Sequence, residues 1–100
     1  MLDANFKIER VLNFRHAGEV RQGKATIGGI RLAPDRKQWL CDVSIDYLGE
    51  ETVTVQGDDP LDAFNHCLFF LSEVILGGTE HGWSVWWQIE GDHGGFVVYQ

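Results

Sequence analysis

The side chains of this chain that could bind a metal ion are four histidines and two cysteines. They are His16, His66, His81, His93, Cys41 and Cys67. Zinc sites usually take such ligands from short motifs such as C-x-x-C, H-x-x-x-H or H-E-x-x-H, and none of these spacings occurs here. His66 and Cys67 are neighbours, but adjacent residues of a helix do not face each other. We therefore predict no metal site, no cofactor and no cysteine nucleophile.

A second place for chemistry is the run Gly-Asp-His-Gly-Gly at residues 91–95. An Asp–His pair can act as a general base, and glycines can leave backbone N–H groups open to an anion. The same run is typical of a hairpin turn, and the phosphate-binding form requires a following helix, where this chain continues as a predicted strand. We predict a turn, no catalytic residue and no enzyme. The alternative is an active site that gathers Asp92, His93 and another ionisable group.

Four carboxylates follow one predicted strand and the turn after it: Asp42, Asp46, Glu50 and Glu51. Two carboxylates can perform acid–base hydrolysis when they face each other across a substrate. Asp42 and Asp46 are about 13 Å apart on an extended strand, and nothing indicates a pocket between them. The pattern favours a solvated acidic face, with a surface that binds a cationic partner as the alternative.

Two aromatic residues fall on the polar side of their elements. Residues spaced 100° apart on a helix place Phe69 with Asp62 and Glu73, opposite the apolar stripe. Trp86 lies among Ser84, Gln88 and Glu90 on its strand. Aromatic side chains with a polar rim are common centres of protein interfaces. The alternative is that other parts of the chain, or a second copy in a homodimer, cover them.

The predicted partner-binding residues combine the carboxylates and the two aromatics. They are Asp42, Asp46, Glu50, Glu51, Asp62, Phe69, Glu73 and Trp86.

The charges are divided along the chain. All eight Lys and Arg lie between Lys7 and Lys37, whereas residues 38–100 carry eleven of the 15 carboxylates, and the formal net charge is -7. Because phosphate affinity comes mostly from Lys and Arg, the acidity argues against a direct nucleic-acid ligand. It suits contact with a basic protein, although the two segments can also neutralise each other within one domain.

Size and composition indicate one folded domain. A chain of 100 residues with 44% hydrophobic content has room for a single core, so we expect one domain at residues 1–100. The start lacks a basic segment followed by an apolar run, which predicts no secretory signal. The longest apolar stretch, around residues 67–71, is too short to cross a bilayer. We expect a cytoplasmic protein with reduced thiols and no membrane partner.

Hydrophobic alternation predicts the strands that position these side chains. Strands are expected at residues 6–14, 20–32 and 39–48, with a fourth at 51–56 after a tight turn at Gly49-Glu50.

The second strand does not have a single apolar face. Ala25 and Ile27 favour one buried face, whereas Ile30 and Leu32 favour the other. The two glycines at 28–29 between them would allow a bulge that switches the face.

A helix is predicted after the fourth strand. Asp59 caps it, Pro60 takes its first position, and the glycines at 77–78 end it. Its apolar stripe is formed by Leu61, Phe64, Leu68, Leu71 and Ile75, flanked by Cys67 and Val74.

Two further strands, at 83–90 and 96–99, form a final hairpin. The order β-β-β-β-α-β-β predicts an α+β fold, with a mainly antiparallel sheet of about six strands and one long helix packed on one face.

The middle of the chain pairs a W-x-C strand with a G-x-D-x-x-x-A helix start. The matching positions are Trp39, Cys41, Ile45, Gly57, Asp59, Leu61 and Ala63. This combination resembles a family of small uncharacterised bacterial α+β proteins, and the likeness covers the middle of the chain. The resemblance implies a bacterial cytoplasmic protein and carries no activity with it.

These observations lead to one functional expectation and one alternative. We expect a non-catalytic acidic protein-binding domain, of the kind found in bacterial immunity proteins that inhibit a basic toxin or nuclease. The alternative is a small homodimeric housekeeping or ligand-binding domain whose charges cancel internally.

Overall fold

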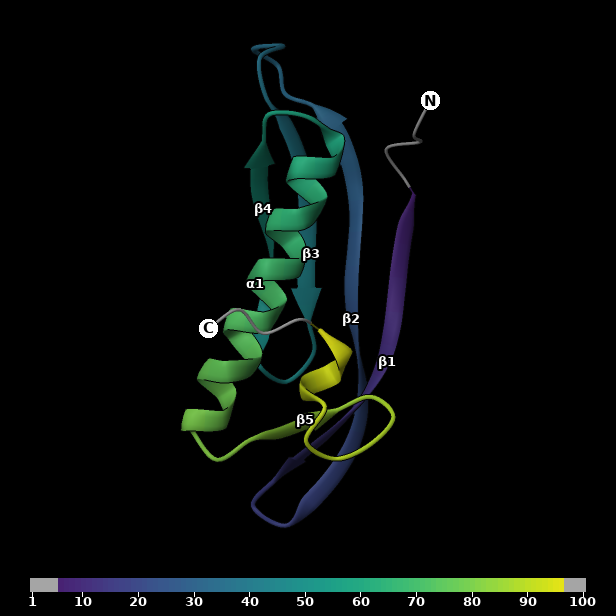
Figure 1. Ribbon diagram of the computed structural model, residues 1–100, viewed down its shortest axis with the longest axis vertical. Coiled ribbons are helices and arrows are strands. Elements are labelled where there is room, and N and C mark those ends of the chain that lie inside the picture. The colour runs from purple at the N-terminus through teal and green to yellow at the C-terminus, as the bar shows by residue number, and fades with distance from the viewer. Residues whose placement is uncertain (1–5, 97–100) are drawn as a thin grey trace.

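The computed structural model describes residues 6–96, which form one antiparallel sheet and one long helix (Figure 1). The elements are β1 (Lys7–His16), β2 (Glu19–Leu32), β3 (Trp39–Ile45), β4 (Gly49–Gly57), α1 (Pro60–Glu80), β5 (Ser84–Trp86) and the 3-10 turn η1 (His93–Gly95). The strand order is β4-β3-β2-β1-β5. The predicted α+β fold class is confirmed, with five strands in the described part of the chain.

Helix α1 covers one face of the sheet, mainly over β3 and β4 (Figure 1). Because β4 and β5 stand at opposite ends of the sheet, the helix carries the chain from one edge back to the other. The core between the two layers includes Leu12 and Phe14 of β1, Val43 of β3, and Leu71 and Ile75 of α1, all almost inaccessible to solvent.

The bulge expected in β2 is present. The register with β3 shifts between Gly28 and Arg31, and Gly29 has a φ of +63°, which glycine adopts without strain. Ala25, Ile27 and Ile30 are consequently all buried on the helix side. The bulge therefore lets residues on both sides of the two glycines face the helix. Leu32, at the end of the strand, is exposed.

The turn between β3 and β4 lies earlier than predicted. Gly49 and Glu50 already belong to β4, and the turn occupies residues 46–48. Asp46 holds this turn from both sides, since its backbone N–H donates to the Lys24 carbonyl and its carboxylate accepts from the Lys24 N–H at 2.8 Å. Tyr47 takes a φ of +66° within the turn. These contacts with β2 decide where β3 ends, and local turn propensity does not show them.

Helix α1 begins as predicted, with the Asp59 side chain accepting from the Asp62 N–H at 2.7 Å. The predicted end at residues 77–78 is wrong, because the helix continues to Glu80. Gly78 is inside the helix, where a Cβ would stand 3.0 Å from the Leu48 side chain. Its role is close packing, and the chain turns instead at Gly82, which has a φ of +87°.

The buried stripe of α1 is rotated from the predicted one. The buried helix residues are Ala63, Cys67, Leu71, Ser72 and Ile75. Leu61, predicted to be buried, is 67% exposed. The helix approaches the sheet through small residues, since a Cβ on Gly57 would stand 2.2 Å from the Ala63 nitrogen.

The strand predicted at 83–90 is shorter, and β5 ends at Trp86. The Asp92 carboxylate draws the N–H groups of residues 87–89 into a turn, which prevents a longer ladder with β1. Of the last predicted strand, residues 97–99 lie outside the described residues.

Candidate functional site

The two thiols are packing groups of the core. Cys41 on β3 and Cys67 on α1 are both buried and interact with each other, and Cys41 Sγ donates to the Gly28 carbonyl at 3.5 Å. Burial raises the pKa of both thiols, which disfavours the nucleophilic thiolate. Within residues 6–96, no three His, Cys, Asp or Glu side chains gather as a metal site would require.

Asp92 organises the loop that follows β5. Its carboxylate oxygens accept from the backbone N–H groups of Trp87, Gln88, Ile89 and Gly94 at 2.9–3.1 Å. Partial burial would raise the pKa of Asp92, but these four donors outweigh it and lower the pKa to about 2. The residues form a turn, as predicted, and the Asp92 carboxylate stabilises it through these four hydrogen bonds.

Asp42 has partners within the chain. It accepts from Arg31 Nη1 at 3.1 Å and from Thr54 Oγ1 at 2.7 Å. Asp46 is exposed, but its carboxylate holds the turn after β3. These two predicted partner-binding carboxylates therefore have structural contacts, and Asp42 is neutralised by a neighbouring strand.

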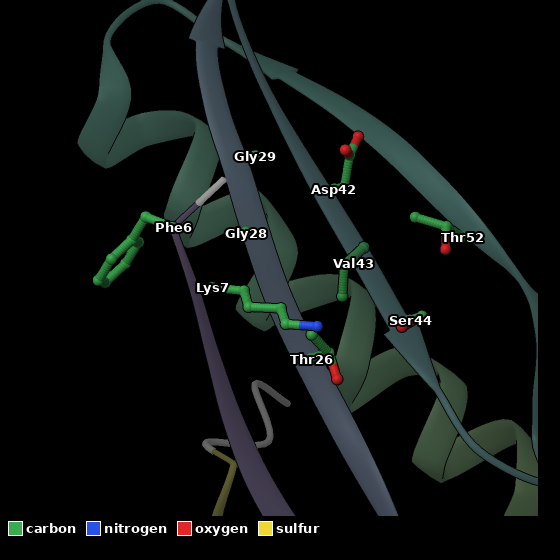
Figure 2. A pocket seen from close by; sticks show the side chains of 9 residues that line it. All are labelled: Phe6, Lys7, Thr26, Gly28, Gly29, Asp42, Val43, Ser44 and Thr52. Atoms are coloured by element: carbon green, nitrogen blue, oxygen red, sulfur yellow. The ribbon is translucent and has the colours of Figure 1, made fainter. Parts of the chain in front are cut away.

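A shallow hollow of about 460 Å³ lies beside Asp42, on the face of the sheet opposite α1 (Figure 2). Figure 2 shows Lys7, Thr26, Ser44 and Thr52 along successive strands of this face. These groups can hydrogen-bond to a polar molecule, but the carboxylate beside them is already paired with Arg31. Phe6 supplies an aromatic side chain to the lining of the hollow, and Asp42 supplies a carboxylate.

The helix carries three of the predicted residues on its outer side. Asp62 accepts from the Asp58 N–H at 2.8 Å and lies 3.5 Å from His66 Nε2. Phe69 is 47% exposed, and Glu73 is exposed one turn further along. The helical spacing thus located these side chains correctly.

Trp86 lies apart from the others, at the opposite end of the sheet. It is half-buried, and the Arg15 guanidinium stands 5.0 Å from its ring centroid. Arg15 also pairs with Glu90. The sequence left open whether Trp86 is an exposed anchor or is covered by other parts of the chain. The structure favours the second, because Arg15 lies over the Trp86 ring. Of the remaining predicted residues, Glu51 is exposed on β4, and the side chain of Glu50 lies outside the described part.

A groove between β4 and α1 was not predicted. We call it the β4–α1 groove; it has a volume of about 280 Å³ and is lined by Ile45, Leu48, Gly49, Glu51, Val53, Phe70 and Val74. Val53 is 37% exposed on its floor. The sequence carried one weak signal for this groove, because Val74 flanks the predicted apolar stripe. That β4 is an edge strand follows only from the sheet order.

An aromatic cluster lies beyond Leu48 at the C-terminal end of α1. Trp83 stacks on His16, with ring centroids 4.4 Å apart, and on Tyr47 at 6.3 Å. A second hollow is lined by Trp83, Tyr47, Leu48 and Val74. It adjoins the β4–α1 groove, because Leu48 and Val74 line both. Aromatic side chains of this kind can anchor a protein partner.

Negative charge gathers in what we call the acidic half, residues 49–80, which comprise β4, α1 and their connection. It holds seven carboxylates and no Lys or Arg: Glu50, Glu51, Asp58, Asp59, Asp62, Glu73 and Glu80. We call residues 7–37 the basic half. Glu9 and Glu19 of this half pair with Lys24 and Arg21, at 3.6 and 3.0 Å. The carboxylates of the two halves are therefore in different electrostatic surroundings.

Comparison of the chain with protein-family models, with curated proteins and with solved structures finds no match. The resemblance of its middle part to a bacterial family therefore stays a prediction. No helix among residues 6–96 is both long enough and apolar enough to cross a membrane.

Proposed function

We propose that this chain is a non-catalytic domain that binds a basic protein through its acidic half. A basic toxin or nuclease held by an immunity-type inhibitor is the specific form of this proposal. The observation that carries it is the set of carboxylates at residues 49–80: the six whose side chains the structure describes form no ion pair with a described Lys or Arg side chain.

Exposed like charges on one side of a small protein produce a field that attracts the opposite charge. Such a field accelerates the encounter with a basic partner, and buried apolar contact then slows dissociation. Glu51 lies in the wall of the β4–α1 groove, so a partner drawn by the carboxylates meets apolar side chains at the same place. The acidic half thus offers both parts of a protein-binding surface.

The proposal is tested by capturing proteins of the source cell on the immobilised chain and eluting them with rising salt. We expect a basic partner whose association rate falls as ionic strength rises, because screening weakens the attraction. The double variant Glu51→Lys/Glu73→Lys should lower that rate by about tenfold. Glu9→Lys is the matched control, because Glu9 is paired with Lys24 in the basic half. A partner that binds regardless of salt and of charge reversal at Glu51 and Glu73 would contradict the proposal.

A further inference from the structure

The strand β4 is the outermost strand at one end of the sheet in the described part of the chain. It pairs with β3 on one side, over residues 53–57 and again at Gly49, with an irregularity in the register between these two parts. The outer side of such a strand presents N–H and C=O groups of alternate residues, which can pair with another extended chain.

We propose that this edge binds an extended, basic segment of a partner protein as an additional strand, with alternate side chains of the segment entering the β4–α1 groove. The inference rests on the proposed function and specifies how the partner is held. In strand addition, main-chain hydrogen bonds supply affinity and side-chain pockets supply specificity.

The groove is placed to receive such side chains. It runs between the edge strand and the helix, with Val53 on the strand side and Phe70 and Val74 on the helix side. Because strand side chains alternate between faces, an added strand would direct every second residue toward the groove. The others would lie beside Thr52 and Thr54 on the polar face, where Thr54 contacts Asp42. A segment of alternating apolar and polar residues fits both faces.

The carboxylates around the β4–α1 groove favour a basic partner segment. Glu51 lies in the groove, and Glu73 is one turn from Phe70 on the overhanging helix. Beside Asp62, the His66 ring reaches the edge strand, where its Nδ1 contacts the Gln56 carbonyl. A lysine or arginine at either end of the segment's groove-facing row of side chains would therefore lie among carboxylates.

The same charges argue against a second copy as the occupant. Two copies that paired through their β4 strands would place one acidic half beside the other, with seven carboxylates and no Lys or Arg in each. Like charges across a strand pair are destabilising. A basic segment of another protein meets no such repulsion.

The test uses two short peptides with the intact protein, each with lysine at both ends of its groove-facing row and threonine at the alternate positions. The lysine–valine peptide has valine between the lysines of that row, and the lysine–serine peptide has serine there. The two carry the same charge, but only the first can fill the groove. We expect the lysine–valine peptide to bind about tenfold more tightly. Hydrogen exchange should slow at alternate amides of β4, those that point away from β3.

A lysine on an edge strand discourages further pairing, so Val53→Lys should weaken binding of the lysine–valine peptide by about tenfold. Val11→Lys is the matched control, because Val11 is an exposed valine of β1 far from the groove. Glu51→Lys serves as a second variant with an exposed side chain, should Val53→Lys disturb the fold.

The outcomes separate the two proposals. Equal binding of both peptides, without slowed exchange in β4, would overturn strand addition and leave the acidic binding surface standing. Failure of both peptides to bind would contradict both proposals. Hydrogen exchange in β4 could instead slow as the protein concentration rises, without any peptide. That result would show that a second copy binds the edge, and it would contradict the proposal that a basic segment of a partner binds there.

Discussion

The acidic and basic halves differ in what their carboxylates do. In the basic half, Glu9 and Glu19 face Lys24 and Arg21, and Arg31 extends the same pattern to Asp42 on β3. In the acidic half, Glu51 and Glu73 are exposed and face no described Lys or Arg side chain. Glu9 and Glu19 are thus paired within the basic strands β1 and β2, Asp42 is paired with Arg31 across β2 and β3, and the excess is left on β4 and α1.

This difference narrows the search for a partner. From the sequence, Asp42 and Asp46 were as good candidates as Asp62 and Glu73. The register of β2 against β3 brings Arg31 to Asp42, and the turn after β3 uses Asp46 to hold Lys24. The remaining candidate for the partner-binding surface is the one around the β4–α1 groove.

The largest expected effect breaks the contact that holds the acidic half together. In Gly57→Ala the new Cβ would stand 2.2 Å from the Ala63 nitrogen, so β4 and α1 must move apart. We expect the free energy of unfolding to fall by about 3 kcal/mol. Gly49→Ala, in the same strand, is the control, since a Cβ there meets nothing within 4 Å. Urea unfolding measures both, and an equal loss in the two variants would refute the close-approach argument.

The next prediction contrasts a structural carboxylate with an exposed one. Asp92→Asn removes the charge that four backbone donors stabilise, and should lower the free energy of unfolding by about 1 kcal/mol at neutral pH, allowing for partial solvent screening. Glu73→Gln should change it by less than about 0.5 kcal/mol, because Glu73 is exposed. Urea unfolding compares them.

The Asp92 contribution should also depend on pH. The pKa of Asp92 is lowered from 3.8 to about 2 on folding, so its stabilisation is complete above the unfolded value and lost as the pH falls through the folded one. The difference in stability between wild type and Asp92→Asn should therefore shrink between about pH 5 and pH 2. Unfolding curves across that range measure it, and a constant difference would contradict the assigned role.

The smallest expected effect tests the neutralised carboxylate. Asp42→Asn weakens a half-exposed ion pair with Arg31, so we expect a loss of stability of about 0.5 kcal/mol. It should leave the affinity for a basic peptide unchanged within about twofold, whereas Glu51→Gln should reduce that affinity without loss of stability. Titration calorimetry and urea unfolding separate the two quantities. A large loss of affinity in Asp42→Asn would return the partner site to β3.

Local patterns were sufficient to predict much of the fold. Alternation located β1 to β3, the Asp59-Pro60 pair located the start of α1, and the glycines at 28–29 predicted the bulge that buries both Ile27 and Ile30. These features depend on residues close together in the chain. The α+β class followed from them.

The remaining features depend on contacts between distant residues. Gly78 is inside α1 because Leu48 packs against it, and the helix stripe is rotated because Ala63 meets Gly57. Trp86 is covered by Arg15, which is far away in sequence. The β4–α1 groove likewise requires the sheet order, which places β4 at an edge. No local spacing contains this information.

The central claim is that the charge available to a partner belongs to the acidic half. The most direct test is an amide chemical-shift titration of the protein with the lysine–serine peptide at low salt. We predict shifts concentrated in β4 and α1, around Glu51, Asp62 and Glu73, and none around Glu9 or Glu19. Shifts spread evenly over the carboxylates of both halves, or centred on Glu9 and Glu19, would contradict the account.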